Sequence, residues 1–137
     1  MEPRGIRNNN PCNIRLSKTV YKGEIVPSKD KSFKQFSSMV YGYRAVFVVL
    51  YYYFTKLGLK TISEMINRWA PPSENNTESY VKHVAEFAQY DKNKIVDVAD
   101  EALMTKIVSA MSFVENGVRP NQSDVASGWE MFKKDRL

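Results

Sequence analysis

The sequence has few of the residues on which metal and thiol chemistry depend. Its 137 residues include one cysteine, Cys12, and one histidine, His83. A single cysteine excludes an internal disulfide and a cysteine-based zinc site, and a single histidine argues against a histidine-rich metal centre. The sequence contains neither a phosphate-binding glycine loop nor a dinucleotide-binding glycine pattern. It therefore predicts a protein without a metal or a cofactor.

The sequence also lacks an apolar stretch long enough to span a bilayer. The most apolar stretch, residues 43–57, is too short and carries Arg44, Thr55 and Lys56 near its ends. The first residues are polar, so no signal peptide is predicted. We therefore expect cytoplasmic synthesis without membrane insertion, and action on a cell wall would need another exit route.

Acidic residues are fewer than basic residues, so the net charge is +5 and the isoelectric point is near 9.3. This balance favours an anionic partner such as nucleic acid, a membrane surface or a cell-wall polymer. The basic residues are scattered, however, and the densest group is interleaved with acids, which is typical of a solvated surface. This group comprises Lys18, Lys22, Lys29, Lys31 and Lys34. Only charge supports a nucleic-acid partner, so none is expected.

The length and the 43% of apolar residues predict one domain, residues 1–137, with its own core. Residues 1–37 show no helical period and are expected to form loops and short strands. A hairpin turn is predicted at Lys22-Gly23. Residues 38–137 have helical patterns. Helices are expected over about 39–56, from 61 to before 71, from 76 or 77, from 100 to about 117, and over 123–134. The predicted class is mainly α (α+β).

The segment from Arg4 to Arg15 is the most polar part of the chain that no helix or strand pattern explains. It places four asparagines and three arginines around Pro11. Asparagine both donates and accepts hydrogen bonds, so such a loop is either a braced structural corner or the wall of a polar binding cleft. Composition alone favours the corner, because asparagine commonly serves turns and caps.

Three glutamates occupy unusual positions. Glu24 follows the predicted turn, Glu74 lies in the proline-stiffened connection 69–77, and Glu115 ends a predicted helix. The negative end of the helix dipole raises the pKa of an acid such as Glu115, and a nearby Phe113 or Trp129 would add desolvation. A carboxylic acid that stays protonated near neutral pH is what glycosidic bond cleavage requires. The alternative interpretation, given equal weight, is that Glu115 is an ordinary surface glutamate beside a glycine that caps the helix.

Several segments resemble, in the same order, a phage and prophage family often labelled structural protein. The segments are RGIRNNNP at 4–11, NIR at 13–15, FKQF at 33–36, YGYRA at 41–45, GLKTI at 58–62, INRWAPPSENNTESY at 66–80 and ENG at 115–117. They extend over nearly the whole chain. The family is associated with virion-bound or lysis-related murein enzymes. The resemblance therefore implies a monomer that acts on peptidoglycan, either with other virion components or during lysis.

The asparagine-proline block followed by FKQF also resembles bacterial glucosaminidases and flagellar muramidases, which have a lysozyme-like helical fold. Their catalytic glutamate precedes the asparagine block, whereas here only residues 1–3 do. The Glu-Asn-Gly at 115–117 is similar to the Glu-Ser-Gly that carries the acid in that superfamily. The resulting hypothesis is a circularly permuted lysozyme-like domain with Glu115 beside the asparagine loop, since compact domains tolerate permutation.

The resemblance implies a glycosidase or lytic transglycosylase with Glu115 as the general acid. Glu24 or Glu74 would supply a second carboxylate if one is used, and the substrate's acetamido group would assist otherwise. The implied substrate-binding residues are Arg7, Asn8, Asn9, Asn10, Asn13, Tyr21, Tyr41, Trp69 and Asn116. Peptide-bond cleavage and a non-catalytic virion or peptidoglycan-binding protein are the rival functions.

The chain departs from the family pattern at two positions. The family usually has glycine where this chain has Cys12, and tryptophan near Tyr21. If the glycine is needed for a positive φ, Cys12 is expected to be strained. Tyrosine can still stack on a sugar ring, so the second change is milder.

Overall fold

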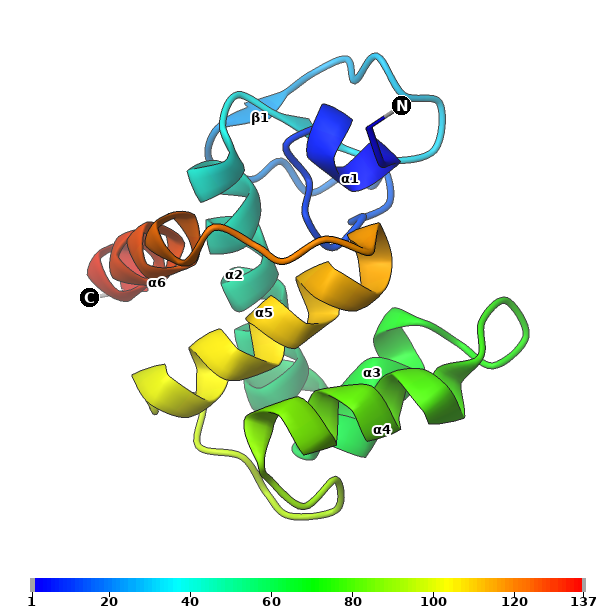
Figure 1. Ribbon diagram of the computed structural model, residues 1–137. Helices are drawn as coiled ribbons and strands as arrows, with labels where there is room; N and C mark the ends of the chain where they lie inside the picture. Colours follow the sequence, from blue (N-terminus) through cyan, green and yellow to red (C-terminus); the bar gives the residue numbers. More distant parts are fainter. Residues whose placement is uncertain (1, 137) are drawn as a thin grey trace.

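The computed structural model describes residues 2–136 (Figure 1). Over these residues the elements are α1 (Arg4–Arg7), β1 (Glu24–Ile25), β2 (Gln35–Phe36), α2 (Met39–Leu57), α3 (Ile62–Trp69), α4 (Thr77–Ala88), α5 (Glu101–Asn116) and α6 (Gln122–Arg136). The predicted mainly helical class with a small β part is confirmed. None of the helices between residues 2 and 136 combines the length and apolarity that a membrane crossing requires.

The long helix α2 packs against α6 and contributes much of the core. It begins after Ser38, whose hydroxyl accepts a hydrogen bond from the Tyr41 amide, and ends at Gly58 in the left-handed conformation (φ 68°). The two helices approach closely at Gly128, where an added Cβ would lie 2.7 Å from Tyr43 Cβ. The Trp129 ring meets Phe47 edge to face at 5.1 Å. These contacts explain why α2 is apolar nearly all round.

The capping signals in the sequence set the ends of the middle helices. Thr61 and Glu64 form the capping box of α3, and Asn76 caps α4. Asp100 caps α5, which ends at Gly117 (φ 71°). These predicted boundaries are confirmed.

The N-terminal region differs from the sequence-based expectation in two ways. Residues 4–7 form the one-turn helix α1, which is too short to show a period. The predicted hairpin at Lys22-Gly23 is wrong, because β1 pairs antiparallel with β2, with Glu24 opposite Phe36. Gly23 instead has φ 78° and packs on the Tyr41 ring, so that a Cβ would lie 2.2 Å from that ring. The chain therefore makes a wide loop between the two strands.

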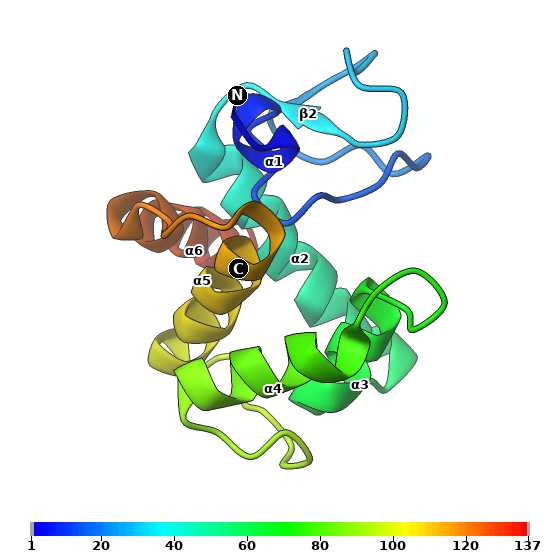
Figure 2. The same cartoon turned by 45° about the vertical axis from the view of Figure 1, so that its right-hand side comes forward.

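The N-terminal segment lies against the C-terminal end of α5, and α4 packs against α5 from the other side (Figure 1). Figure 2 shows the same arrangement from a second direction, with α1 above the end of α5 and α4 below α5. Asn116, the last residue of α5, donates from Nδ2 to the Pro11 carbonyl at 2.8 Å. Gly5 touches the same side chain, since an added Cβ would lie 2.4 Å from Asn116 Oδ1. The fold thus joins residues about one hundred positions apart.

Candidate active site

Glu115 sits where the N-terminal loop, α4 and α5 meet. Asn13 donates from Nδ2 to Glu115 Oε1 at 2.8 Å. The buried Tyr80 hydroxyl donates to the other oxygen, Oε2, at 3.0 Å. Both carboxyl oxygens therefore have a donor, one from the asparagine loop and one from α4. The structure places Glu115 beside the asparagine loop, through Asn13.

Burial raises the pKa of the Glu115 carboxyl above its ordinary value, and the hydrogen bonds from Asn13 and Tyr80 and the charge of Arg15 act in the opposite direction. The sequence predicted a raised pKa from the helix end and from desolvation by Phe113 or Trp129. The largest cause in the structure is desolvation. Burial and the nearby Glu115 raise the pKa of Tyr80 well above its ordinary value, so its phenol stays a donor.

Three hollows adjoin one another along this side of the molecule, and we call them together the Glu115 groove. The first, of about 100 Å³, and the second, of about 350 Å³, share Glu115 and Asn75. The third, of about 430 Å³, shares His83 and Phe113 with the second. Glu115 thus lines both the first and the second hollow. An elongated ligand could pass the acid on both sides.

The first hollow contains two of the residues predicted from the sequence besides Asn13 and Glu115. Glu74 lines it and lies 3.6 Å from Arg15, in an exposed ion pair. Trp69 is half-buried, donates from Nε1 to the Cys12 carbonyl at 3.0 Å and packs on Tyr53. Glu74 is therefore the second carboxylate that the structure brings to the hollow with Glu115, and Trp69 is an aromatic wall.

The remaining asparagines brace the loop. Asn10 is fully buried, donates to the Ile14 and Lys34 carbonyls and accepts from the Ile14 amide. Asn8 bonds to Asp30 and Asn9 to the Phe36 carbonyl. None of the three lines the Glu115 groove. Residues 8–10 thus form the braced structural corner. Of the four asparagines between Arg4 and Arg15, only Asn13 reaches the groove.

Asn116 and Arg7 also lie away from the groove. Asn116 is buried and uses its amide to hold the Pro11 and Ser112 carbonyls. Arg7 lines a separate hollow together with Asn8 and Asp30. Asn116 therefore fixes the N-terminal segment against α5, and Arg7 does not lie near Glu115.

Glu24 takes part in a buried ion pair. Lys34 Nζ lies 2.9 Å from Glu24 Oε2, and the two side chains are 0% and 4% exposed. Lys34 also donates to the Ser17 and Thr19 carbonyls. The expectation that Lys34 lies on a solvated surface is wrong, because its charge is balanced inside the N-terminal region. Glu24 does not line the Glu115 groove.

The two tyrosines predicted to bind substrate, Tyr21 and Tyr41, lie near this ion pair and do not line the groove. The Tyr21 amide donates to Glu24 Oε1, and Lys34 Nζ lies 5.5 Å from the centre of the Tyr21 ring. Tyr41 is covered by Gly23. Of the three proposed stacking residues, the structure brings only Trp69 to the groove.

Cys12 is buried in the core and is not strained. Positive φ values occur on either side of it, at Asn9 (52°) and Asn13 (54°), and not at Cys12 itself. Asparagine tolerates this conformation better than most residues. The expected strain at Cys12 is therefore absent. Burial and the nearby Glu115 raise the pKa of its thiol well above the ordinary value.

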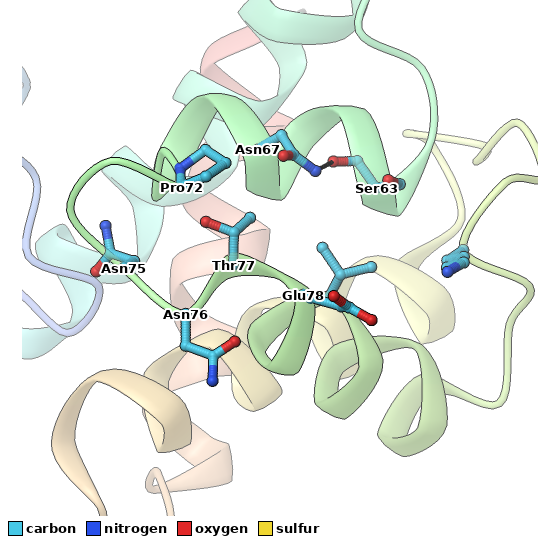
Figure 3. Close-up of a pocket in the computed structure, with 9 residues that line it drawn as sticks. Ser63, Asn67, Pro72, Asn75, Asn76, Thr77 and Glu78 are labelled. Carbon is cyan, nitrogen blue, oxygen red and sulfur yellow. Dashed lines mark hydrogen bonds between the residues drawn. The ribbon is translucent and has the colours of Figure 1, made fainter.

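Another hollow lies between α3 and the start of α4 (Figure 3), and it shares Asn75 and Asn76 with the second hollow. Ser63 and Asn67 of α3 face Thr77 and Glu78 of α4 across it, and Asn76 lies at its edge. Its one carboxylate, Glu78, is exposed. This hollow therefore offers no buried acid comparable to Glu115.

The sequence did not identify several residues of the groove. Tyr80 was not among the predicted site residues, yet it donates a hydrogen bond to an acid 35 positions away. Phe33 was noted only as part of a family motif, and the guanidinium groups of Arg4 and Arg15 lie over its ring, 5.0 and 5.1 Å from the ring centre. His83, the single histidine of the sequence, stacks on Phe113 at 5.4 Å. No local pattern marks these long-range contacts.

Replacing Tyr80 with Phe is expected to raise the pKa of Glu115 further. The lost hydrogen bond stabilises the carboxylate, whereas desolvation, which opposes ionisation, remains. The acid should then stay protonated to a higher pH. The measurement is an NMR titration of the carboxyl carbon of Glu115, with the exposed Tyr52→Phe as control. An unchanged or lowered pKa in Tyr80→Phe would contradict the described hydrogen bond.

Comparison with known proteins places the chain in a family of bacteriophage proteins. It is 37% identical over 131 residues to Protein P5 of Pseudoalteromonas phage PM2, an alignment that covers 93% of this chain and 80% of P5. The chain therefore belongs to the family of that phage protein. No model of a known protein family matches it. The predicted phage affiliation is thus confirmed.

Proposed function

We propose that this phage protein degrades peptidoglycan by cleaving the glycan strand, with Glu115 as the general acid. The observation that carries the proposal is the position of Glu115: it is an acid with a raised pKa in the middle of a groove, held by Asn13 and Tyr80. Glycosidic cleavage needs such a group, because the leaving oxygen must receive a proton as the bond to the sugar carbon breaks. The lysozyme-like, circularly permuted relationship is part of the proposal.

In this mechanism the Glu115 proton moves to the glycosidic oxygen, and the bond between that oxygen and the anomeric carbon breaks. The carboxylate that results takes a proton from the group that attacks the anomeric carbon. Water as that group gives hydrolysis and a reducing end. A hydroxyl of the same sugar gives transglycosylation and no reducing end. Asn13 and Tyr80 keep both carboxyl oxygens in place through these steps.

Glu74 is the proposed second carboxylate, because it lines the same hollow as Glu115. Glu74 is exposed, and its ion pair with Arg15 is exposed as well, so the pair contributes little energy. A carboxylate in that position could activate water. The alternative is assistance by the substrate's acetamido group, which needs no second acid. Trp69 would stack on a sugar ring in either scheme, because it is partly exposed and lines the same hollow as the acid.

The proposal is tested by incubating the purified protein with purified peptidoglycan and analysing the released fragments by mass spectrometry. We expect soluble fragments cut between sugars, with the stem peptides intact. Intact glycan strands with cut peptides would refute glycan cleavage and indicate the peptidase variant. The presence or absence of reducing ends separates hydrolysis from transglycosylation.

The rival function is a non-catalytic peptidoglycan-binding or virion structural protein. One observation favours it: the two hydrogen bonds that hold Glu115 also join the N-terminal loop to α4 and α5, so the acid has a structural role in any case. Under this alternative the protein co-sediments with insoluble peptidoglycan, or with other virion proteins, but releases no fragments.

A further inference from the structure

The third hollow of the Glu115 groove differs in chemistry from the other two. We call it the Arg119 pocket, and it is formed by α4, α5 and the segment before α6. Its lining residues are His83, Phe87, Ser109, Phe113, Arg119, Pro120 and Gln122. Ser109 and Glu115 are six residues apart on α5, which corresponds to about 9 Å at 1.5 Å per residue. The pocket is therefore within reach of a substituent on a sugar bound at Glu115.

Most of the pocket wall is apolar and accessible. Phe87 is 52% exposed and Phe113 is 38% exposed, and the His83 ring stacks on Phe113 with an interplanar angle of 17°. Large aromatic side chains left at the surface around a hollow indicate a site that is covered by a ligand.

Arg119 gives this apolar pocket a positive charge that the protein does not neutralise. Among residues 2–136 it has no ion-pair or hydrogen-bond partner, whereas Arg4, Arg15 and Arg44 each pair with an acid. Ser109 and Gln122 bond to each other at 3.3 Å beside it. The guanidinium is suited to a carboxylate, which it can bind through two parallel hydrogen bonds.

We propose that the Arg119 pocket binds the stem peptide of peptidoglycan, with a peptide carboxylate on Arg119 and small apolar side chains against Phe87 and Phe113. The stem peptide combines a carboxylate with methyl groups on a short chain attached to the sugar, which matches a cation in an aromatic hollow next to a saccharide groove. This inference rests on the proposed function. It narrows the substrate to glycan that carries its stem peptides, in preference to bare glycan.

The test uses Arg119→Ala and two forms of one peptidoglycan preparation, with stem peptides intact and with stem peptides removed by an amidase. We expect KM for the peptide-bearing form to rise about tenfold, the loss of one charged hydrogen-bonding contact, with kcat unchanged. KM for the stripped form should not change. The matched control is Lys106→Ala, which removes an exposed positive charge from α5 outside the pocket. Equal effects on both forms, or no effect on either, would overturn the inference.

A binding measurement separates this inference from the proposed function. The wild-type protein is titrated with a soluble disaccharide that carries its stem peptide, and then with the same disaccharide without the peptide, by calorimetry. Tighter binding of the peptide-bearing form that is lost in Arg119→Ala supports the pocket even if the protein cleaves no glycan. Equal affinity for the two disaccharides would reject the pocket even if cleavage is observed.

Discussion

Glu115→Gln is expected to lower the rate of peptidoglycan cleavage by about 10²- to 10⁴-fold, the usual contribution of a general acid. The amide keeps the size of the side chain and can still bond to Asn13 and Tyr80, but it has no proton to give to the glycosidic oxygen. The measurement is zymography followed by quantitation of soluble fragments. Glu86→Gln, an exposed glutamate on α4, is the matched control and should retain full activity.

The loss of activity in Glu115→Gln should not come from unfolding. Because burial raises the pKa of Glu115 in the folded protein, the folded state binds this proton more tightly than the unfolded state does. The free energy of unfolding therefore falls as pH rises from the ordinary glutamate pKa through the raised one. The amide removes this dependence, so the variant should be at least as stable as the wild type at neutral pH in urea denaturation. Wild-type cleavage by Glu115→Gln would exclude Glu115 as the acid.

Lys34→Met is expected to lower the free energy of unfolding by about 3–5 kcal/mol, because it leaves the Glu24 carboxylate buried without its cation. The Ser17 and Thr19 carbonyls would lose a donor in the same variant. A loss of this size is a large part of the stability of an ordinary domain, which is about 5–15 kcal/mol. Urea denaturation followed by circular dichroism provides the measurement.

Two further variants isolate the buried ion pair. The double variant Lys34→Met with Glu24→Leu should recover part of the lost stability, because it removes the unpaired charge. Lys133→Met breaks an exposed pair with Glu130 at 3.8 Å and should cost less than about 1 kcal/mol. A similar small cost for Lys34→Met would show that Glu24 is solvated and not enclosed by the N-terminal region.

The helices were predictable because their signals are local. Thr61 and Glu64, three residues apart, specify the start of α3, and Gly117 specifies the end of α5 by its left-handed conformation. The strand pairing was not predictable in the same way. Gly23 has the positive φ that a turn requires, so the sequence signal at Lys22-Gly23 was read correctly to that extent. The Tyr41 ring, however, packs beside Gly23 where a hairpin would place a paired strand.

The candidate site was predictable only in part. The resemblance to lysozyme-like enzymes suggested that Glu115 lies beside the asparagine loop, and the residues alone did not. Polarity could not show which asparagines line the groove, because Asn10 and Asn13 differ only in the partners that the fold gives them. Lys34 was misplaced for a related reason: lysine is rarely buried, and its compensation by Glu24 depends on tertiary structure.

The hydrogen bond between Asn13 and Glu115 spans 102 positions, and this separation has a consequence for synthesis. Contacts between distant residues form late, because a long loop must close before they contribute energy. A ribosome must therefore add the chain as far as Gln122 before all of the groove can exist. Fragments that end before residue 115, or that have lost residues 4–13 to a protease, would lack either the acid or the wall that holds it. The groove can therefore form only in a chain that contains both the N-terminal segment and α5.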